Sequence, residues 1–395
     1  MKKLTYVTQK LLRRPRKLHT KHPTLPKLDD EFYKPRPQNY WTHNGTTWVA
    51  ASSSAPPPPS PLPPRSSSSS SSKAETSTNP KSLRLFSWNI DMLQPNAEPR
   101  MAHAISHLHT LVTSTPPSTP VIIFLQELLP SDLAQLRSTP WIQRSFSMTE
   151  LDDQRKWPSS LYGTTTLVDR RLQIRSVFRV PWISKFERDG LFVDVELRNR
   201  GDDAAAGMEE CGNGKGGETV LRLCNTHLES LVADPPVRPL QLESASMYLR
   251  TSSSSNIAAA ILAGDLNAIE SFDRILHTTN NLHDLYLSLG GQEDSDDGYT
   301  WGYQVPEPVR QKFGCSRMDK ILFRGEVRGV GFDRFGVGVV VEGSEGEEMK
   351  ARGEDVWVTD HYGIMGDFEV AGSWELCVDV NGVGVESGVL KSKLT

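Results

Sequence analysis

A carboxylate and a carboxamide, Asp265 and Asn267, lie two residues apart directly after a short apolar run that ends at Gly264. An apolar run of this length that is bounded by turn residues is typical of a buried strand. Side chains two residues apart on an extended backbone point to the same side, so we expect both groups to enter one pocket. A carboxylate can bind a metal or accept a proton, and a carboxamide can donate to a phosphate oxygen. Taken alone, the pattern is also ordinary turn chemistry.

Five further places in the sequence put acids, amides or imidazoles beside a predicted strand. The residues concerned are Asn89 and Asp91, Glu127, His227, Asp319, and Asp360 with His361. Each has a plain structural explanation by itself, such as a turn at Asn89, a helix cap at Glu127 or a surface ion pair at Asp360. Together they supply what one reaction needs, and the joint pattern therefore favours an active site.

That reaction is the hydrolysis of a phosphodiester. The attacking water must lose a proton while negative charge develops on the phosphoryl and leaving oxygens. A Mg²⁺ ion held by one or two carboxylates suits this chemistry, and we expect Glu127 to bind it directly. We expect Asp265 to hold and deprotonate the water, Asn267 to orient it or a phosphate oxygen, and His361 to face the phosphate as an imidazolium. The sequence has no Cys₂His₂ or HExxH spacing, so it predicts no zinc site.

The elements that position these residues are mostly strands. Apolar or alternating runs predict strands over residues 83–90, 121–125, 161–168, 174–180, 191–197, 220–224, 258–263, 318–323 and 363–370. Helical spacing of apolar residues predicts helices over 101–112 and 241–249. Many strands with few helices and no strict βαβ repeat indicate an α/β domain in which helices flank two packed sheets.

Composition divides the chain into four parts. Residues 1–50 form a basic N-terminal tail, and residues 51–82 form a linker with four consecutive prolines and seven consecutive serines. The catalytic domain spans residues 83–370, with a Gly- and acid-rich insertion at 201–218, and residues 371–395 form a C-terminal extension. The aromatic patch at 40–49 can dock on a partner or on the body of the protein.

Charge and cysteine content limit the functional classes. The first 40 residues hold 11 Lys/Arg against 3 Asp/Glu, which leaves a net charge of −12 on the rest of the chain. Nucleic-acid binding by such an acidic body must be local, in a cleft. The four cysteines are scattered and indicate reduced thiols, and no apolar run is long enough to span a membrane. The acid-free stretch 1–28 suits a nuclear import signal, a mitochondrial presequence or an unaddressed tail.

The motifs resemble those of the endonuclease/exonuclease/phosphatase superfamily, which includes DNase I and the abasic-site exonucleases. The matching strings are Ser87-Trp88-Asn89-Ile90-Asp91, Phe124-Leu125-Gln126-Glu127, Thr226-His227-Leu228-Glu229-Ser230, Gly264-Asp265-Leu266-Asn267, Met318-Asp319-Lys320-Ile321 and Asp360-His361-Tyr362-Gly363. Within the superfamily, the Trp-Asn-Ile-Asp string, Arg238 with Gln241-Leu242, and Tyr299-Thr300-Trp301 are most similar to the 5′-tyrosyl-DNA phosphodiesterases. These enzymes release a topoisomerase II tyrosine from a DNA 5′ phosphate.

The resemblance implies a four-layered α/β sandwich of the DNase I type, with two packed mixed sheets flanked by helices. It implies that Glu127 binds Mg²⁺, or alternatively Mn²⁺, with Asp91 close by. It also implies that Asp265 activates the water, that Asp319 orients His361 and that Trp301 lines the groove for the DNA strand. The other residues of the implied site belong to the phosphate pocket, except Asp360, which is part of the Asp-His motif. The pocket residues are Asn89, His227, Ser230, Asn267 and His361.

The implied substrate is a DNA 5′ end that carries a tyrosyl or peptide adduct. We expect the enzyme to be a monomer that repairs DNA in the nucleus and does not contact a membrane. One departure concerns Ile269, because the family usually has an Arg at that position; Arg274 is a candidate replacement for the phosphate contact. The resemblance also leaves other activities open, namely abasic-site endonuclease, deadenylase and sphingomyelinase-like hydrolysis. A non-catalytic scaffold is a further alternative.

Overall fold

The protein folds around two eight-stranded mixed sheets that pack face to face. The computed structural model describes residues 32–51, 80–199, 219–251 and 256–378. The presequence-like stretch 1–28, most of the predicted linker and the 201–218 insertion lie outside these residues. Among the described residues, no helix is long and apolar enough to cross a membrane.

The first sheet combines one strand from the N-terminal segment with seven strands from residue 174 onward. Its order is β1 (Arg36–Pro37), β8 (Ile174–Pro181), β9 (Asp189–Asn199), β10 (Val220–His227), β11 (Ile257–Asp265), β13 (Asp319–Gly325) and β12 (His283–Asp284), with β16 (Trp374–Leu376) paired to β9. β10 and β11 run parallel, and β13 runs antiparallel to β11. The register therefore places the ends of β10 and β11 and the start of β13 at one edge of this sheet.

The second sheet has the order β14 (Val327–Phe335), β15 (Gly363–Val370), β4 (Ser82–Asn89), β5 (Val121–Leu128), β7 (Gly163–Asp169), β6 (Phe146–Met148), β2 (Tyr40–His43) and β3 (Trp48–Ala51). β4 and β5 are parallel to each other, and β15 is antiparallel to β4. The sequence Val-Ile-Ile-Phe-Leu of β5 is apolar on both faces because the strand is buried between the other sheet and a helix layer.

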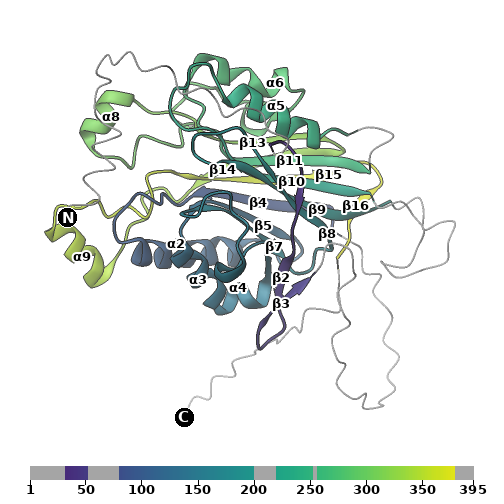
Figure 1. Ribbon diagram of the computed structural model, residues 1–395, viewed down its shortest axis with the longest axis horizontal. Helices are drawn as coiled ribbons and strands as arrows, with labels where there is room; N and C mark the ends of the chain where they lie inside the picture. Colours follow the sequence, from purple (N-terminus) through teal and green to yellow (C-terminus); the bar gives the residue numbers. More distant parts are fainter. Residues whose placement is uncertain (1–31, 52–79, 200–218, 252–255, 379–395) are drawn as a thin grey trace, which may run out of the picture.

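Helices cover the outer face of each sheet, which gives four layers (Figure 1). The helices are α2 (Ala97–Ser114), α3 (Pro130–Ser138), α4 (Pro140–Ser145), α5 (Arg238–Tyr248), α6 (Leu276–Thr279), α7 (Leu285–Ser288), α8 (Glu307–Phe313) and α9 (Gly343–Ala351), with 3₁₀ turns at Asp152–Gln154 and Ser271–Arg274. In α2 the buried residues Met101, Ala104, Ile105 and Leu108 recur at helical spacing, so one stripe of the helix packs on the second sheet. The predicted α/β sandwich of two mixed sheets is thus confirmed.

Three apolar cores hold these layers together. The central core lies between the sheets and includes Phe124, Leu223 and Ile261. The outer cores lie under α2, α3 and α4 on one side and under α5 on the other. The two sheets are therefore held at a fixed separation, which matters for any site that takes residues from both.

The boundary of the domain differs from the one predicted at residue 83. The predicted N-terminal tail ends in three strands: β1 pairs with β8, and the β2–β3 hairpin pairs with β6. Trp41 is buried in the core under the second sheet, so the aromatic patch docks on the body of the protein rather than remaining a tail. Similarly, residues 374–376 of the predicted extension add β16 to β9.

Candidate active site

The strand ends of both sheets meet at one edge of the sandwich. On the first sheet, His227, Asp265 and Asp319 are direct neighbours across β10, β11 and β13. On the second sheet, Asn89 ends β4 and lies next to the end of β5. The Asn89 amide donates to Asp265 Oδ2 over 3.0 Å, and this bond joins the two sheets within the site.

A buried amide layer lies directly beneath these residues. Gln126 Nε2 donates to Ser87 Oγ at 3.1 Å and to Asn225 Oδ1 at 2.9 Å. Asn225 in turn donates to the Thr165 carbonyl at 3.0 Å. Gln126 and Asn225 are fully buried and lie one and two residues from Glu127 and His227, so the layer fixes the strand ends against one another.

Asp265 occupies the centre of the site and is almost fully buried. Its Oδ2 lies 3.2 Å from His227 Nε2 and 3.8 Å from His361 Nε2, and its Oδ1 accepts a hydrogen bond from the Asn267 backbone at 2.8 Å. Burial raises the pKa of Asp265, but the two imidazoles lower it by more, so the pKa lies well below its usual range. The group is therefore a carboxylate at neutral pH, the form that accepts a hydrogen bond or a proton from water.

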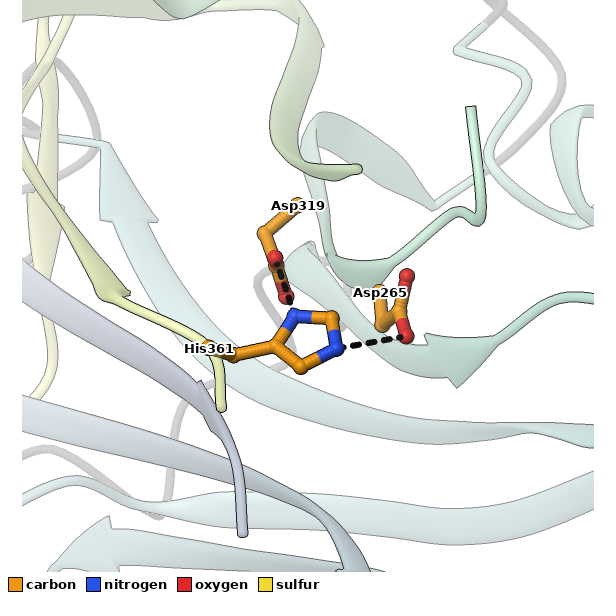
Figure 2. A group of neighbouring side chains, drawn as sticks. All are labelled: Asp265, Asp319 and His361. Atoms are coloured by element: carbon orange, nitrogen blue, oxygen red, sulfur yellow. Dashed lines mark hydrogen bonds and ion pairs between the residues drawn. The ribbon is translucent and has the colours of Figure 1, made fainter. Parts of the chain in front are cut away.

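His361 lies between two carboxylates (Figure 2). Its Nδ1 is 2.8 Å from Asp319 Oδ2, and its Nε2 faces Asp265. Burial lowers the pKa of His361, but Asp319, Asp360 and Asp265 raise it by more, and the pKa lies well above its ordinary value. The imidazole is thus a cation at neutral pH, held in place also by the bond from Trp88 Nε1 to the His361 carbonyl.

Two site acids have an unusual backbone. Asp91 and Glu127 have φ angles of 56° and 58°, in the left-handed region that residues other than glycine seldom adopt, and Asn267 shares it at 48°. Such conformations cost about 1–3 kcal/mol each and gather at functional sites. Here they turn the side chains of three strand ends toward the same edge.

The acids around Glu127 suit a divalent cation. Burial, and then the neighbouring Asp360 carboxylate, raise the pKa of Asp91 to about 7, because the carboxylates repel one another. Glu127 Oε2 accepts a bond from the Met92 backbone at 3.2 Å, and its other oxygen lies 3.8 Å from His227 Nδ1. Carboxylate oxygens are the donors that Mg²⁺ prefers, so Glu127 and Asp91 have suitable ligand chemistry for this ion.

Among the described residues, Asp265, Asp319 and His361 have ligand atoms that lie within 4.8 Å of one another. A protonated imidazole has no lone pair to give to a metal. Because His361 is a cation between two carboxylates, this grouping is better described as an internal ion triplet. Glu127 and Asp91 therefore remain the predicted residues for a metal ion.

Asn267, Ser230 and His227 form the neighbouring wall. Asn267 Nδ2 donates to the Leu228 carbonyl at 3.1 Å and lies 3.4 Å from Ser230 Oγ. Trp301 donates from Nε1 to Asp360 Oδ2 at 2.7 Å and forms a β-bridge with His361. All eleven residues singled out in the sequence thus lie in one connected cluster.

The structure adds Arg188, a site residue that sequence reasoning missed. Its Nη1 donates to His227 Nδ1 at 2.6 Å, its Nη2 donates to Ser230 Oγ at 2.9 Å, and Glu127 Oε1 lies 3.7 Å away. The guanidinium is also stacked over the Tyr162 ring at 5.1 Å. Because a guanidinium only donates, the proton of a neutral His227 lies on Nε2, facing Asp265.

Arg274, in contrast, does not replace the Arg that the family has at position 269. It forms an exposed ion pair with Asp294 at 2.6 Å. Ile269 is 38% exposed. Arg188 is therefore the additional site cation, and it comes from the loop directly before β9 rather than from the Gly-Asp-x-Asn loop.

Comparisons with known proteins identify the family of this chain and proteins of similar fold. The model of the Endonuclease/Exonuclease/phosphatase family matches residues 86–361. Similar solved structures include TDP2 of D. rerio in complex with a single-strand DNA product (19% identity, TM-score 0.52, covering 74% of this chain and 100% of that one) and a humanized D. rerio TDP2 with 14 mutations (20%, 0.51, 74% and 100%). A truncated TDP2 of Caenorhabditis elegans is similar at 19% identity and a TM-score of 0.52, covering 73% of this chain and 98% of that one. A search of curated proteins gave no match.

Proposed function

The chain belongs to the endonuclease/exonuclease/phosphatase family, and from this premise we propose that it hydrolyses the 5′-phosphotyrosyl bond of protein–DNA adducts. The observation that carries the proposal is the arrangement around Asp265. One buried carboxylate lies between two imidazoles and accepts a bond from Asn89 of the other sheet. Such a centre suits a phosphoryl group that is attacked by water.

The proposed reaction uses the residues in separate roles. The His361 imidazolium and the amide of Asn267 donate to the phosphoryl oxygens, where negative charge develops. Asp265 accepts a hydrogen bond from the attacking water and aligns it with phosphorus. Asp319 keeps His361 charged and oriented. A divalent cation at Glu127 and Asp91 would supply further neutralisation of the phosphate charge.

The tyrosyl-DNA specificity rests on the motif resemblance and on Trp301. This indole flanks His361, and an aromatic face beside the phosphate pocket suits stacking with a base. The D. rerio TDP2 solved with a single-strand DNA product has a similar fold. A DNA substrate would require entry to the nucleus, for which we propose the basic stretch 1–28 as the import signal.

The experiment compares four substrates in the presence of Mg²⁺: a single-stranded oligonucleotide with a 5′-phosphotyrosine, abasic-site DNA, a polyadenylated RNA and sphingomyelin. We expect release of tyrosine with a 5′ phosphate left on the DNA, loss of this activity with EDTA, and loss in Asp265→Asn. Turnover of another substrate alone would refute the specificity while keeping the family chemistry. A folded protein that turns over none of them would support the scaffold alternative.

A further inference from the structure

An apolar rim borders the phosphate pocket. Ser230 Oγ and Asn267 Nδ2, which lie 3.4 Å apart, belong to the pocket wall. Leu231 and Val232 follow Ser230 directly in the chain, and Ile269 lies two residues after Asn267. The side chains of Leu231, Val232 and Ile269 are 53%, 68% and 38% exposed. These three side chains are called the apolar rim below, and they lie at the surface beside the pocket.

A buried ion pair joins the two loops that carry the apolar rim. Arg238 donates to both carboxylate oxygens of Asp273, at 2.9 and 2.7 Å, and both side chains are almost fully buried. The same guanidinium donates to the Leu231 carbonyl at 2.7 Å, and Asp273 accepts a bond from the Ile269 backbone amide at 3.1 Å. Leu231 and Ile269 are therefore each one hydrogen bond from the same ion pair, which fixes the two loops against each other.

The backbone of Leu231 is unusual for an exposed leucine. Its φ angle is 65°, in the left-handed region that residues other than glycine seldom adopt. Because more than half of the side chain is exposed, core packing does not offset the cost of this conformation. Strained residues of this kind gather at functional sites. A ligand that covers Leu231 would supply the contacts that the fold itself does not provide.

The apolar rim offers no cation to a second phosphate. In its two loops and at the start of α5, the basic residues are Arg238 and Arg274, and each is already paired with an aspartate. The acids Asp234 and Glu270 lie in the same loops, and within the described part of the chain neither forms an ion pair. A phosphate placed here would therefore meet apolar side chains and negative charge without a compensating cation.

We propose that the apolar rim binds an uncharged ring carried by the scissile phosphate and that this chain recognises no second phosphate there, an inference that rests on the proposed function. In a 5′-tyrosyl-DNA substrate, the ring is the base of the first nucleotide or the tyrosine. Both are flat groups attached to the same phosphate, and either can cover Leu231 and Ile269. Recognition of the scissile phosphate stays with the pocket, where Arg188 donates to Ser230 at 2.9 Å.

Ile269 is the residue that keeps charge off the apolar rim. An arginine at this position, which the family usually has, would add a cation and so favour a second phosphate of the strand. Isoleucine offers apolar surface instead. We therefore expect substrate choice at the rim to follow ring contacts rather than the charge of the strand.

The test uses four oligonucleotides: an unmodified strand with a 5′-phosphotyrosine, one whose first internucleotide linkage is an uncharged methylphosphonate, one without the first base, and one joined to serine instead of tyrosine. The variants are the double variant Leu231→Asn/Ile269→Asn and the single variant Ile269→Arg. Asparagine tolerates the left-handed backbone at position 231. The controls are Val330→Asn and Val330→Arg, because Val330 of β14 is 40% exposed, similar to Ile269, and lies on the other sheet.

We expect the methylphosphonate to leave the wild-type kcat/KM unchanged and to lower that of Ile269→Arg roughly fivefold, the value of one exposed ion pair. Removal of the bound ring should lower the wild-type kcat/KM about tenfold more than that of the double variant, as for about 60 Å² of apolar contact at about 25 cal/mol per Å². The arm that shows this difference identifies the ring as the base or the tyrosine. Both Val330 variants should behave like the wild type.

The proposal would be overturned if both ring removals had equal effects in the wild type and the double variant. It would also be overturned if the methylphosphonate slowed the wild type as much as Ile269→Arg. Should no strand release its 5′ group, the proposed function fails, and fluorescence anisotropy of strands with a bare 5′ phosphate then decides on the rim through the base and methylphosphonate comparisons. Binding to phosphatidylcholine vesicles that the double variant loses would assign the rim to a lipid surface instead.

Discussion

Replacing Asp319 by Asn separates the two roles that a buried carboxylate can have in this site, metal binding and support of a cation. Asp319 is 1% exposed, and its Oδ2 lies 2.8 Å from His361 Nδ1. At an effective dielectric constant of about 20, two unit charges at this separation interact by about 6 kcal/mol, which is an upper bound. Asn keeps an oxygen that accepts from Nδ1, so the expected loss is smaller, about 3–4 kcal/mol, or 10²–10³-fold in kcat.

The assay is the rate of tyrosine release as a function of Mg²⁺ concentration in wild type, Asp319→Asn and Glu127→Gln. We expect the Mg²⁺ concentration for half-activation to change little in Asp319→Asn, because this residue supports His361 rather than a metal. In Glu127→Gln the same concentration should rise at least about tenfold, as for the loss of a direct ligand. Binding of Mn²⁺ measured by equilibrium dialysis provides a readout without turnover, and circular dichroism checks the fold of each variant.

The pH profile gives an independent check of the same reasoning. His361 has a raised pKa in the folded protein, so it is protonated at neutral pH and loses its proton only as the pH rises through that raised value. Without Asp319, the pKa of His361 should fall, and the alkaline decline of kcat should begin at lower pH. The reasoning would be refuted if Asp319→Asn weakened Mg²⁺ as much as Glu127→Gln and regained full kcat at saturating Mg²⁺. The metal would then belong to the group of Asp265, Asp319 and His361.

Three further variants test other parts of the structure. Asp265→Asn should abolish turnover while the thermal unfolding transition stays cooperative; measurable turnover would remove the central role of this carboxylate. Arg188→Lys loses the forked guanidinium that donates to both His227 and Ser230. The kcat/KM should therefore fall about 10–100-fold, within the range for charge-assisted hydrogen bonds. A wild-type kcat/KM would exclude Arg188 from the site. Burial raises the pKa of Asp132 from 3.8 to about 6, so the folded protein binds the extra proton and its free energy of unfolding should fall by up to about 3 kcal/mol as the pH rises from 4 to 6. Asp132→Asn should not show this fall, which urea unfolding at pH 4 and pH 8 will measure.

The parts of the fold that could be predicted from sequence have strong local signals. The apolar runs of β5 and β11 are followed within two residues by Glu127 and Asp265, so both the strands and the site residues were visible in the sequence. Their clustering was predicted from chemistry, because one reaction needs all of these residue types together. The connected cluster of all eleven residues agrees with that prediction.

The parts that could not be predicted depend on contacts between distant segments. Arg188 lies in a loop without a motif, and only the pairing of β9 with β10 brings it to His227. Arg274 was near the expected position in sequence, but a nearby acid, Asp294, binds it outside the site. The β2–β3 hairpin precedes a low-complexity stretch, which obscured its pairing with β6.

The position of β15 in its sheet has a consequence for how activity arises during synthesis. β15 lies between β4 and β14, so β4 pairs with a strand almost 280 residues later in the chain, as in Ile364 with Ser87. Such distant pairing slows folding, because the entropy cost of closing a long loop comes before the stabilisation from the contact. His361 lies directly before β15, and its partners Asp265 and Asp319 lie on the other sheet. A growing chain therefore has no assembled hydrolytic centre until its last strands have been made and docked.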